Sequence, residues 1–282
     1  MAARIINGKE IAERIKEEIR NEALAFAEKH GRKPGLAVVL VGDDPASAIY
    51  VRNKSLACEK CEIRSLEYRL PASASQEEVA QTVKEVAAND LVDGMIVQLP
   101  LPKHINEKEI LSLVPAEKDA DGFSAQNAGK LLLGGECLSA CTPQGIIELI
   151  KSTGVDICGK HAVVVGRSNI VGKPVAVMLL ENNATVTVCH SKTQNIADFT
   201  KSADILVVAV GKKEFIKGDM VKPGAVVIDV GMNRVNGKLY GDVEFSSVSE
   251  VASFITPVPG GVGPMTVTML LKNTLKAASR EK

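Results

Sequence analysis

The chain has 282 residues, enough for two domains of ordinary size, and 45% of them are apolar, so a sizeable core can be buried. Lys and Arg together number 34 and so do Asp and Glu, which makes the formal net charge zero and leaves no basic excess for binding nucleic acid. Aromatic residues make up only 3% and tryptophan is absent, which argues against a base-stacking surface.

Helix and strand patterns alternate along the first half, which favours α/β layers built on parallel sheets. Asn7 is placed to cap a long amphipathic helix that stops near Gly31, and Ser75 begins a later helix with Glu78 three residues on, a capping box. The other segments expected in this half are a helix over 46–61 and strands over 35–41, 64–70 and 93–98. Residues 115–143 hold four glycines and few regular apolar repeats, so we place the join between two domains there.

The same alternation continues in the second half. Thr142 is expected to cap a helix that has Pro143 at its first position. Strands are then expected over 161–166, 184–189, 204–210 and 225–230, and helices over 173–182 and 194–201. A last helix is expected to start at Pro264 and to include residues 270–278. We expect it to pack on the first domain.

The N-terminal residues lack the apolar core of a signal peptide, and no apolar stretch approaches the ~18 residues of a membrane span. We therefore expect a cytoplasmic protein with reduced cysteines and no membrane partner. Cys58 and Cys61 form one Cys-x-x-Cys on a helical pattern, without a second pair or a nearby histidine. Since a structural zinc site needs four ligands, no metal site is expected.

A phosphate site is predicted where the strand over 161–166 breaks into a turn of small residues and a helix then begins. Free backbone N–H groups and the positive end of the helix dipole would meet a phosphate there. The glycine spacing departs from G-x-G-x-x-G, because Ser168 takes the place of the second glycine and Gly172 falls one residue late. An ordinary tight turn is the alternative.

The next strand indicates which dinucleotide would bind. In an NAD site an acidic residue after this strand binds the ribose 2′-OH, but here the strand over 184–189 is followed by His190, Ser191 and Lys192. Ser191, together with Arg167 from the first turn, suits the 2′-phosphate of NADP. A solvated turn is the alternative.

Tyr50 and Lys54 are four residues apart and so share one helix face. An aromatic ring beside an amine could hold a flat ring and exchange a proton, and an amine near apolar neighbours has a lowered pKa. Gln98, at the end of the strand over 93–98, could orient Lys54. The alternative is a solvated lysine and a core tyrosine.

Two further segments carry unusual residues. Asp119 and Asp121 could bind a metal or hydrogen-bond a nitrogen-rich ring, or they could belong to an Asx-type turn that ends at Gly122. Residues 256–264 alternate proline and glycine, and three glycines in four positions allow close backbone approach to a ligand. A ligand-wrapping loop is favoured there over a linker.

Together these segments resemble the bifunctional methylenetetrahydrofolate dehydrogenase/methenyltetrahydrofolate cyclohydrolase family over nearly the whole chain. Five motifs in the family's order make the resemblance specific. They are Tyr50-Val51-x-x-Lys54, Asp93-Gly94 leading to Gln98-Leu99-Pro100-Leu101-Pro102, Lys118-Asp119-x-Asp121-Gly122, Gly166-Arg167-Ser168 through Gly172-Lys173-Pro174, and Pro257-Val258-Pro259-Gly260-Gly261-Val262-Gly263-Pro264.

The resemblance implies an α/β protein of two domains with a cleft between them. Residues 1–120 would form a catalytic, folate-binding domain, with a C-terminal helix over 265–282 packed back on it, and residues 140–264 a Rossmann-type NADP domain. It also implies a homodimer, no metal, and two reactions of one-carbon metabolism that serve purine and amino-acid biosynthesis. NADP+ would oxidise 5,10-methylenetetrahydrofolate to the 5,10-methenyl cation, and water would open that cation to 10-formyltetrahydrofolate.

The resemblance also assigns residues. Lys54 would be the central cyclohydrolase residue, Gln98 would position it, Tyr50 would stack on the folate and Asp121 would bind the amino-pyrimidine edge of the pterin. The expected cofactor residues are Thr142, Gly166, Arg167, Ser168, Ile170, Ser191 and Met232. Of these, Met232 would lie near the nicotinamide end, together with Thr266. The expected substrate-binding residues are Tyr50, Val51, Arg52, Asn53, Lys54, Val97, Gln98, Leu99, Asp121, Pro259, Gly260, Gly261, Val262 and Gly263.

Three positions depart from the family pattern. Leu56 stands where a second lysine is common, Glu62 where a glycine usually ends the helix, and Met232 replaces a usual isoleucine of similar volume. Two other functions stay open at this point. One is an NADP dehydrogenase that acts on a cyclic hydroxy acid through Lys54 and Asp121, and the other is a non-enzymatic nucleotide sensor.

Overall fold

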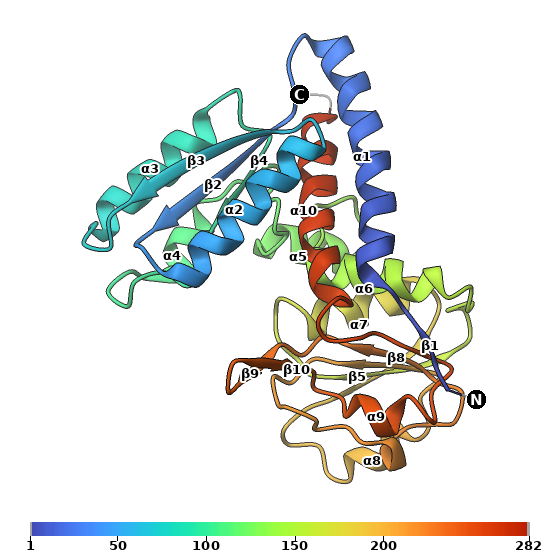
Figure 1. Ribbon diagram of the computed structural model, residues 1–282. Coiled ribbons are helices and arrows are strands. Elements are labelled where there is room, and N and C mark those ends of the chain that lie inside the picture. The colour runs from blue at the N-terminus through green and yellow to red at the C-terminus, as the bar shows by residue number, and fades with distance from the viewer. Residues whose placement is uncertain (1, 281–282) are drawn as a thin grey trace. The chain divides into compact units, whose positions relative to one another are not determined.

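The computed structural model describes residues 2–280, apart from the side chains of Pro45, Ala46 and Ala48 (Figure 1). The chain forms two units. The Lys54 unit comprises Arg14–Cys141 and the residues from Val267 onward, and the Arg167 unit comprises the residues up to Glu13 and Thr142–Thr266. The last two residues of the segment expected over 265–282 lie outside the described residues.

The Lys54 unit is built on a three-stranded parallel sheet with the order β3-β2-β4. Its elements are α1 (Gly8–His30, of which residues from Arg14 belong here), β2 (Gly35–Val41), α2 (Pro45–Lys60), β3 (Arg64–Leu70), α3 (Gln76–Ala88), β4 (Gly94–Val97), α4 (Glu107–Ser112), α5 (Ala125–Leu132) and the later part of α10 (Val262–Ala278). Every residue of β2 is buried, as expected for the central strand of a parallel sheet. The helices and strands expected over residues 7–98 are confirmed.

One face of this sheet packs on α3. Ala37, Val39 and Val41 alternate along β2 and share a buried cluster with Val79 and Val83 of α3. The capping box that begins α3 is present, because Ser75 Oγ accepts from Glu78 N at 3.2 Å and Glu78 Oε2 accepts from Ser75 N at 2.7 Å. The sheet is thus covered on this face by a helix whose start the sequence specifies.

The end of α2 explains one departure from the family pattern. Glu62 follows this helix with φ +57°, in the left-handed region that favours glycine. Its carboxylate forms an ion pair with Lys33 Nζ at 2.6 Å, which also lowers the pKa of Glu62. Glutamate therefore occupies the glycine position of a helix end and is held there by a cation.

The segment expected as a loose join holds regular structure. It contains α5, which begins after Ser124, whose hydroxyl accepts from Asn127 N at 3.2 Å. The sequence pattern missed this helix because it is short and has Gly129 in its middle. Its buried face contains Asn127 and Leu131.

The Arg167 unit is built on a six-stranded parallel sheet with the order β1-β11-β8-β7-β5-β6. Its elements are β1 (Arg4–Ile5), α6 (Cys141–Ser152), β5 (His161–Val165), α7 (Gly172–Glu181), β6 (Thr185–Cys189), α8 (Ile196–Thr200), β7 (Ile205–Val208), η1 (Gly218–Met220), β8 (Val226–Asp229), β9 (Asn233–Val235), β10 (Lys238–Tyr240), α9 (Phe245–Val248) and β11 (Phe254–Ile255). The strand order reverses at β5, since β6 lies on one side of it and β7 on the other. In open sheets of this kind, ligands bind beyond the carboxyl ends of the strands at such a reversal.

Two helix starts differ from expectation. α6 begins at Cys141, so Thr142 is not its cap, and the Thr142 hydroxyl instead bonds the Thr266 hydroxyl at 2.9 Å. α10 begins at Val262, before the expected start at Pro264, because proline lacks an N–H and is tolerated in the first turn of a helix. Among the described residues no helix is both long and apolar enough to cross a membrane.

Candidate active site

Lys54 and Gln98 meet at the carboxyl end of the three-stranded sheet. Lys54, on α2, donates through Nζ to Gln98 Oε1 at 2.9 Å. Gln98 lies one residue beyond β4, where its N–H donates to Val39 O at 2.8 Å, and its side-chain Nε2 donates to Leu99 O at 2.7 Å. The second bond fixes the amide orientation, so Gln98 presents its oxygen to the amine.

The environment of Lys54 lowers its pKa. Burial is the largest cause, and the negative charge of Asp121 opposes it. Burial also raises the pKa of Asp121 to about 6, although the Lys54 cation acts in the opposite direction. The Lys54 amine has a lowered pKa and the Asp121 carboxyl group a raised one, and the charge of each affects the pKa of the other. Such paired shifts are typical of catalytic sites.

The two acids of the Asp119–Asp121 segment have different surroundings. Asp119 is buried and accepts from Gly122 N at 3.0 Å, from Ser124 N at 2.7 Å and from Asn127 Nδ2 at 3.2 Å. It therefore forms the Asx-type turn that the sequence left open. Asp121 is half-buried, and its backbone oxygen accepts from Cys141 N at 3.3 Å.

The remaining residues of the Tyr50 and Gln98 motifs fall into two groups. Tyr50 is 49% exposed, and Arg52 and Asn53 are also exposed. Val51 and Val97 are buried in the core, while Leu99 is half-buried. The exposed ring of Tyr50 is available to a ligand, whereas the two valines set the position of the backbone.

Cys58, Cys61 and Cys141 are buried free thiols. Burial raises the pKa of Cys58 to about 12, and it also raises the pKa of Cys141 well above its ordinary value. Cys61 Sγ donates to Lys16 O at 3.6 Å, and Cys141 Sγ donates to Ala120 O at 3.2 Å. Over residues 2–280, no group of three or more His, Cys, Asp or Glu side chains is arranged to hold a metal ion.

Sequence reasoning missed one residue that supports Asp121. Asn273, buried on α10, donates through Nδ2 to Ala120 O at 2.9 Å and to Ser139 O at 2.8 Å. It therefore ties the backbone beside Asp121 to the segment that precedes α6. No local pattern signals this contact, because 153 residues separate Asn273 from Ala120.

In the Arg167 unit, the turn after β5 requires its glycines. Gly166 has φ +133°, and a Cβ on it would lie 2.3 Å from Ala209 O. A Cβ on Gly172 would lie 2.2 Å from Gly166 O. The start of α7 is therefore packed directly on the turn, as the third glycine of a dinucleotide motif would allow.

The N–H groups at the start of α7 are not free, contrary to expectation. Ser168 Oγ accepts from Val171 N at 3.1 Å and from Gly172 N at 3.3 Å, and Ser168 O accepts from Lys173 N at 3.0 Å. The next residue, Pro174, has no N–H. Ser168 thus caps the helix, which a pattern based on glycine spacing could not show.

A cavity of about 210 Å³ opens at the carboxyl ends of β5, β6 and β7. Its walls include Arg167, His190, Ser191 and Lys212, and none of the described residues that line it is acidic. A cation-lined cavity without a carboxylate fits an anionic group such as a phosphate. Lys212 was not among the residues singled out from the sequence, although its place in the loop after β7 was an available signal.

The remaining residues expected to bind the cofactor lie as follows. Thr142 and Thr266 share the hydrogen bond described above. Met232 is 53% exposed, and its sulfur would lie 3.8 Å from a Cβ on Gly263. Ile170 is 47% exposed in the turn before α7.

The glycine-rich loop that precedes α10 is packed against the start of α1. A Cβ on Gly8 would lie 1.8 Å from Gly261 O, and a Cβ on Gly261 would lie 2.6 Å from Pro257 O. Gly260 has φ +105°. The close approach that these glycines permit is therefore made, within this unit, by the chain's own backbone.

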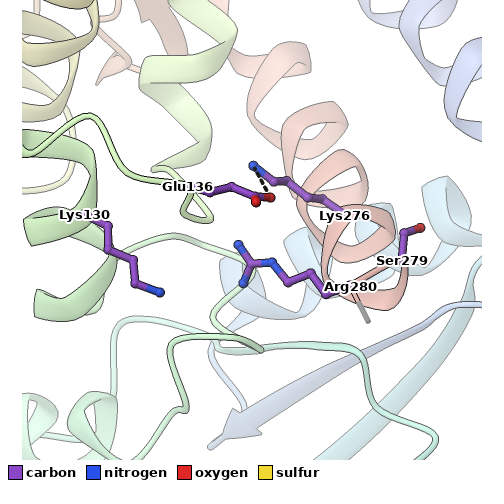
Figure 2. A pocket seen from close by; sticks show the side chains of 5 residues that line it. All are labelled: Lys130, Glu136, Lys276, Ser279 and Arg280. Atoms are coloured by element: carbon purple, nitrogen blue, oxygen red, sulfur yellow. Dashed lines mark ion pairs between the residues drawn. The ribbon is translucent and has the colours of Figure 1, made fainter. Parts of the chain in front are cut away.

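A larger cavity, of about 690 Å³, lies in the Lys54 unit beside the ends of α5 and α10 (Figure 2). Lys276 there pairs with Glu136 at 3.4 Å and donates to Cys137 O at 3.1 Å. Together with Lys130 and Arg280, it stands in or just after the last turn of a helix, where a cation complements the carbonyl end of the helix dipole. This arrangement accounts for the three cations, and none of the expected site residues lines this cavity.

Comparison with known proteins covers both units. A family model described as tetrahydrofolate dehydrogenase/cyclohydrolase, catalytic domain, matches residues 6–121, and one described as the NAD(P)-binding domain of the same proteins matches residues 140–282. A bifunctional protein FolD from Acetivibrio thermocellus is 57% identical over 279 residues, which is 99% of this chain and 98% of the relative.

Solved structures agree with this comparison. The bifunctional FolD enzyme from Campylobacter jejuni is 47% identical with a TM-score of 0.95, and the match covers 98% of this chain and 99% of that one. A Trypanosoma brucei dehydrogenase-cyclohydrolase, solved with NADP cofactor and an inhibitor, is 40% identical with a TM-score of 0.94, covering 99% and 98%.

Proposed function

This chain belongs to the tetrahydrofolate dehydrogenase/cyclohydrolase family, and we propose that Lys54 is the residue around which its hydrolytic step is built. The protein is a bifunctional enzyme: it oxidises 5,10-methylenetetrahydrofolate with NADP+ and hydrolyses the methenyl product to 10-formyltetrahydrofolate. Membership of this family replaces the two alternatives, a hydroxy-acid dehydrogenase and a non-enzymatic nucleotide sensor.

In the oxidation, a hydride leaves the one-carbon bridge of the substrate, and bound NADP+ supplies its acceptor. The chain's own contribution is positioning, which can supply much of the rate. Arg167, Ser191 and Lys212 would hold the phosphate-bearing ribose, because they place cations and a hydroxyl around one cavity in which no described lining residue is acidic. Ser168 would hold the turn in shape through the three N–H groups that it binds.

Folate would be held by the residues at the carboxyl end of the three-stranded sheet. The exposed ring of Tyr50 would stack on the pterin, and the Asp121 carboxylate would accept N–H groups of its amino-pyrimidine edge. The other expected contacts within this unit, from Arg52 and Asn53 and from the backbone near Leu99, keep the same role in this proposal.

In the hydrolysis, water adds to the methenyl carbon and loses one proton to give a carbinol. The carbinol hydroxyl then loses its proton as the carbon–N5 bond opens, so that one of the two protons ends on N5, the other is released, and the formyl group stays on N10. A neutral Lys54 amine would accept the proton from water and return a proton to N5 as the ring opens. Burial lowers the pKa of Lys54 and so increases the share of the neutral amine, and the hydrogen bond to Gln98 Oε1 uses one amine hydrogen while leaving the nitrogen lone pair available. The observation that carries the proposal is the hydrogen bond from Lys54 Nζ to Gln98 Oε1, at a buried position that lowers the pKa of Lys54.

The test is Lys54→Met, assayed for both reactions. We expect hydrolysis of supplied methenyltetrahydrofolate to fall by at least 10²-fold, the usual contribution of a positioned acid or base. Lys60→Met changes an exposed lysine at the end of the same helix and should leave both rates unchanged. Undiminished hydrolysis in Lys54→Met would remove the proposed role while leaving the family assignment intact.

We also propose that the protein is a cytoplasmic homodimer that takes part in purine and amino-acid biosynthesis. β6 is an edge strand of the six-stranded sheet, and Val188 on it is 40% exposed. Leu180 of α7 and Phe199 of α8, two helices that contact this strand, are 60% and 39% exposed. An exposed edge flanked by apolar side chains favours pairing with a second copy, which sedimentation at the assay concentration would detect.

A further inference from the structure

Three consecutive backbone N–H groups after β7 point at a single carboxylate. Val210 N and Gly211 N donate to Asp242 Oδ2 at 2.6 and 2.9 Å, and Lys212 N donates to Asp242 Oδ1 at 2.9 Å. Gly211 has φ +65°, which lets the backbone curl around the oxygen atoms. Successive N–H groups arranged in this way form a concavity that commonly binds an anion such as phosphate.

Asp242 fills that concavity from within the chain. Its carboxylate is fully buried and accepts a fourth hydrogen bond, from Asn233 Nδ2 at 2.8 Å. Asn233 directly follows Met232, which is expected at the nicotinamide end. One carboxylate therefore joins the loop after β7 to the start of β9.

A second buried carboxylate holds Asp242 in place. Asp229, the last residue of β8, accepts from Asp242 N at 2.8 Å, from Gly231 N at 2.9 Å and from Val243 N at 3.0 Å. The space around both groups is closely filled: a Cβ on Gly241 would lie 1.8 Å from Asp229 Oδ2, and one on Gly231 would lie 2.4 Å from Asp242 Oδ1. Neither segment can shift without breaking several of these bonds.

The loop that Asp242 holds is a wall of the cation-lined cavity. Ala209, Val210 and Lys212 line it opposite Arg167 and Ser191. We propose that Asp242 is a positioning residue for NADP+, a built-in anion that fixes residues 210–212 in the conformation that receives the cofactor. This inference rests on the cofactor site proposed above.

The carboxylate is required because four donors meet its two oxygen atoms. Oδ2 accepts hydrogen bonds from Val210 N and Gly211 N, and Oδ1 accepts hydrogen bonds from Lys212 N and Asn233 Nδ2. An asparagine of the same shape would turn an NH2 group toward one of these pairs, leaving two donors without an acceptor. Asp242→Asn therefore removes the anion and keeps the volume.

The experiment measures NADP+ binding and both activities in Asp242→Asn and Asp242→Ala. We expect the Kd and KM for NADP+ to rise at least tenfold, while the KM for folate and the rate of methenyltetrahydrofolate hydrolysis, which needs no NADP+, stay within twofold. Asp204→Ala is the matched control, since Asp204 accepts from His161 N at 3.0 Å and from Lys222 Nζ at 2.6 Å just before the amino end of β7. Its NADP+ affinity should be that of the unchanged protein.

Chemical rescue separates anion filling from a general structural role. In Asp242→Ala, acetate or formate should restore at least half of the lost NADP+ affinity, whereas chloride at the same ionic strength should not. NADP+ affinity unchanged in Asp242→Asn, equal loss of hydrolysis and NADP+ binding, or equal effects of acetate and chloride would each overturn the proposal. Arg167→Met is assayed in parallel: if that variant binds NADP+ normally, the proposed cofactor site fails, whatever Asp242 does.

Discussion

The carboxyl group of Asp121 offers a quantitative test of the folate site. Burial raises its pKa to about 6, against the opposing effect of the Lys54 cation. The group is then ionised in about nine molecules of ten at pH 7 and in about one of ten at pH 5, because each pH unit changes the ratio tenfold. If the ionised form binds the amino-pyrimidine edge of the pterin, the KM for 5,10-methylenetetrahydrofolate should rise about tenfold per pH unit below pH 6.

The assay follows NADPH formation from pH 5 to pH 8 with NADP+ saturating. Asp121→Asn should have a raised folate KM that does not change with pH, since an amide does not titrate. Lys54→Met should move the inflection to higher pH, because the cation that favours the ionised carboxylate is gone. The KM for NADP+ is the internal control. A flat folate KM between pH 5 and 7 in the unchanged protein, or a profile that still bends near pH 6 in Asp121→Asn, would refute this reasoning.

Two further substitutions test the framework. Arg32→Met should lower the free energy of unfolding by about 2–3 kcal/mol, because it leaves the buried Asp93 carboxylate without two bonds of 2.7 Å, whereas Lys33→Met, which breaks an exposed pair, should change it by at most about 1 kcal/mol; urea unfolding that ranks them equally would contradict this. Gly172→Ala should raise the KM for NADP+ at least tenfold in steady-state assays and leave the rate of methenyltetrahydrofolate hydrolysis unchanged. In Gly129→Ala the added Cβ has nothing within 4 Å, so that control should change neither the KM for NADP+ nor the hydrolysis rate. A normal KM for NADP+ in Gly172→Ala would refute the packing argument.

Elements with strong local signals were predictable from the sequence. β2 reads as seven consecutive apolar or small residues, and α3 carries its own capping box, so both were expected within one residue of where they lie. The pairing of Lys54 with Gln98 was also predictable, although 44 residues separate them, because parallel strands bring their carboxyl ends to one edge of a sheet.

Contacts without a local signal were not predictable. The three N–H groups bound by Asp242 lie 30 to 32 residues before it, and nothing in either segment marks the pairing. The expectation of free N–H groups at the start of α7 was wrong for another reason. The sequence indicated a helix end suited to an anion, but the hydroxyl of Ser168 satisfies those donors locally, and side-chain capping of this kind depends on a rotamer rather than on spacing.

The capped start of α7 bears on how coenzyme choice could be re-engineered. Because Ser168 already occupies donors at the helix start, we propose that selection between a phosphorylated and an unphosphorylated adenosine depends on the exposed side chains of Arg167 and Ser191, which line the cavity. Neither belongs to the buried framework that shapes the turn. Substituting Arg167 and Ser191 is therefore a route to an altered preference between NADP and NAD that leaves the buried residues of the turn unchanged.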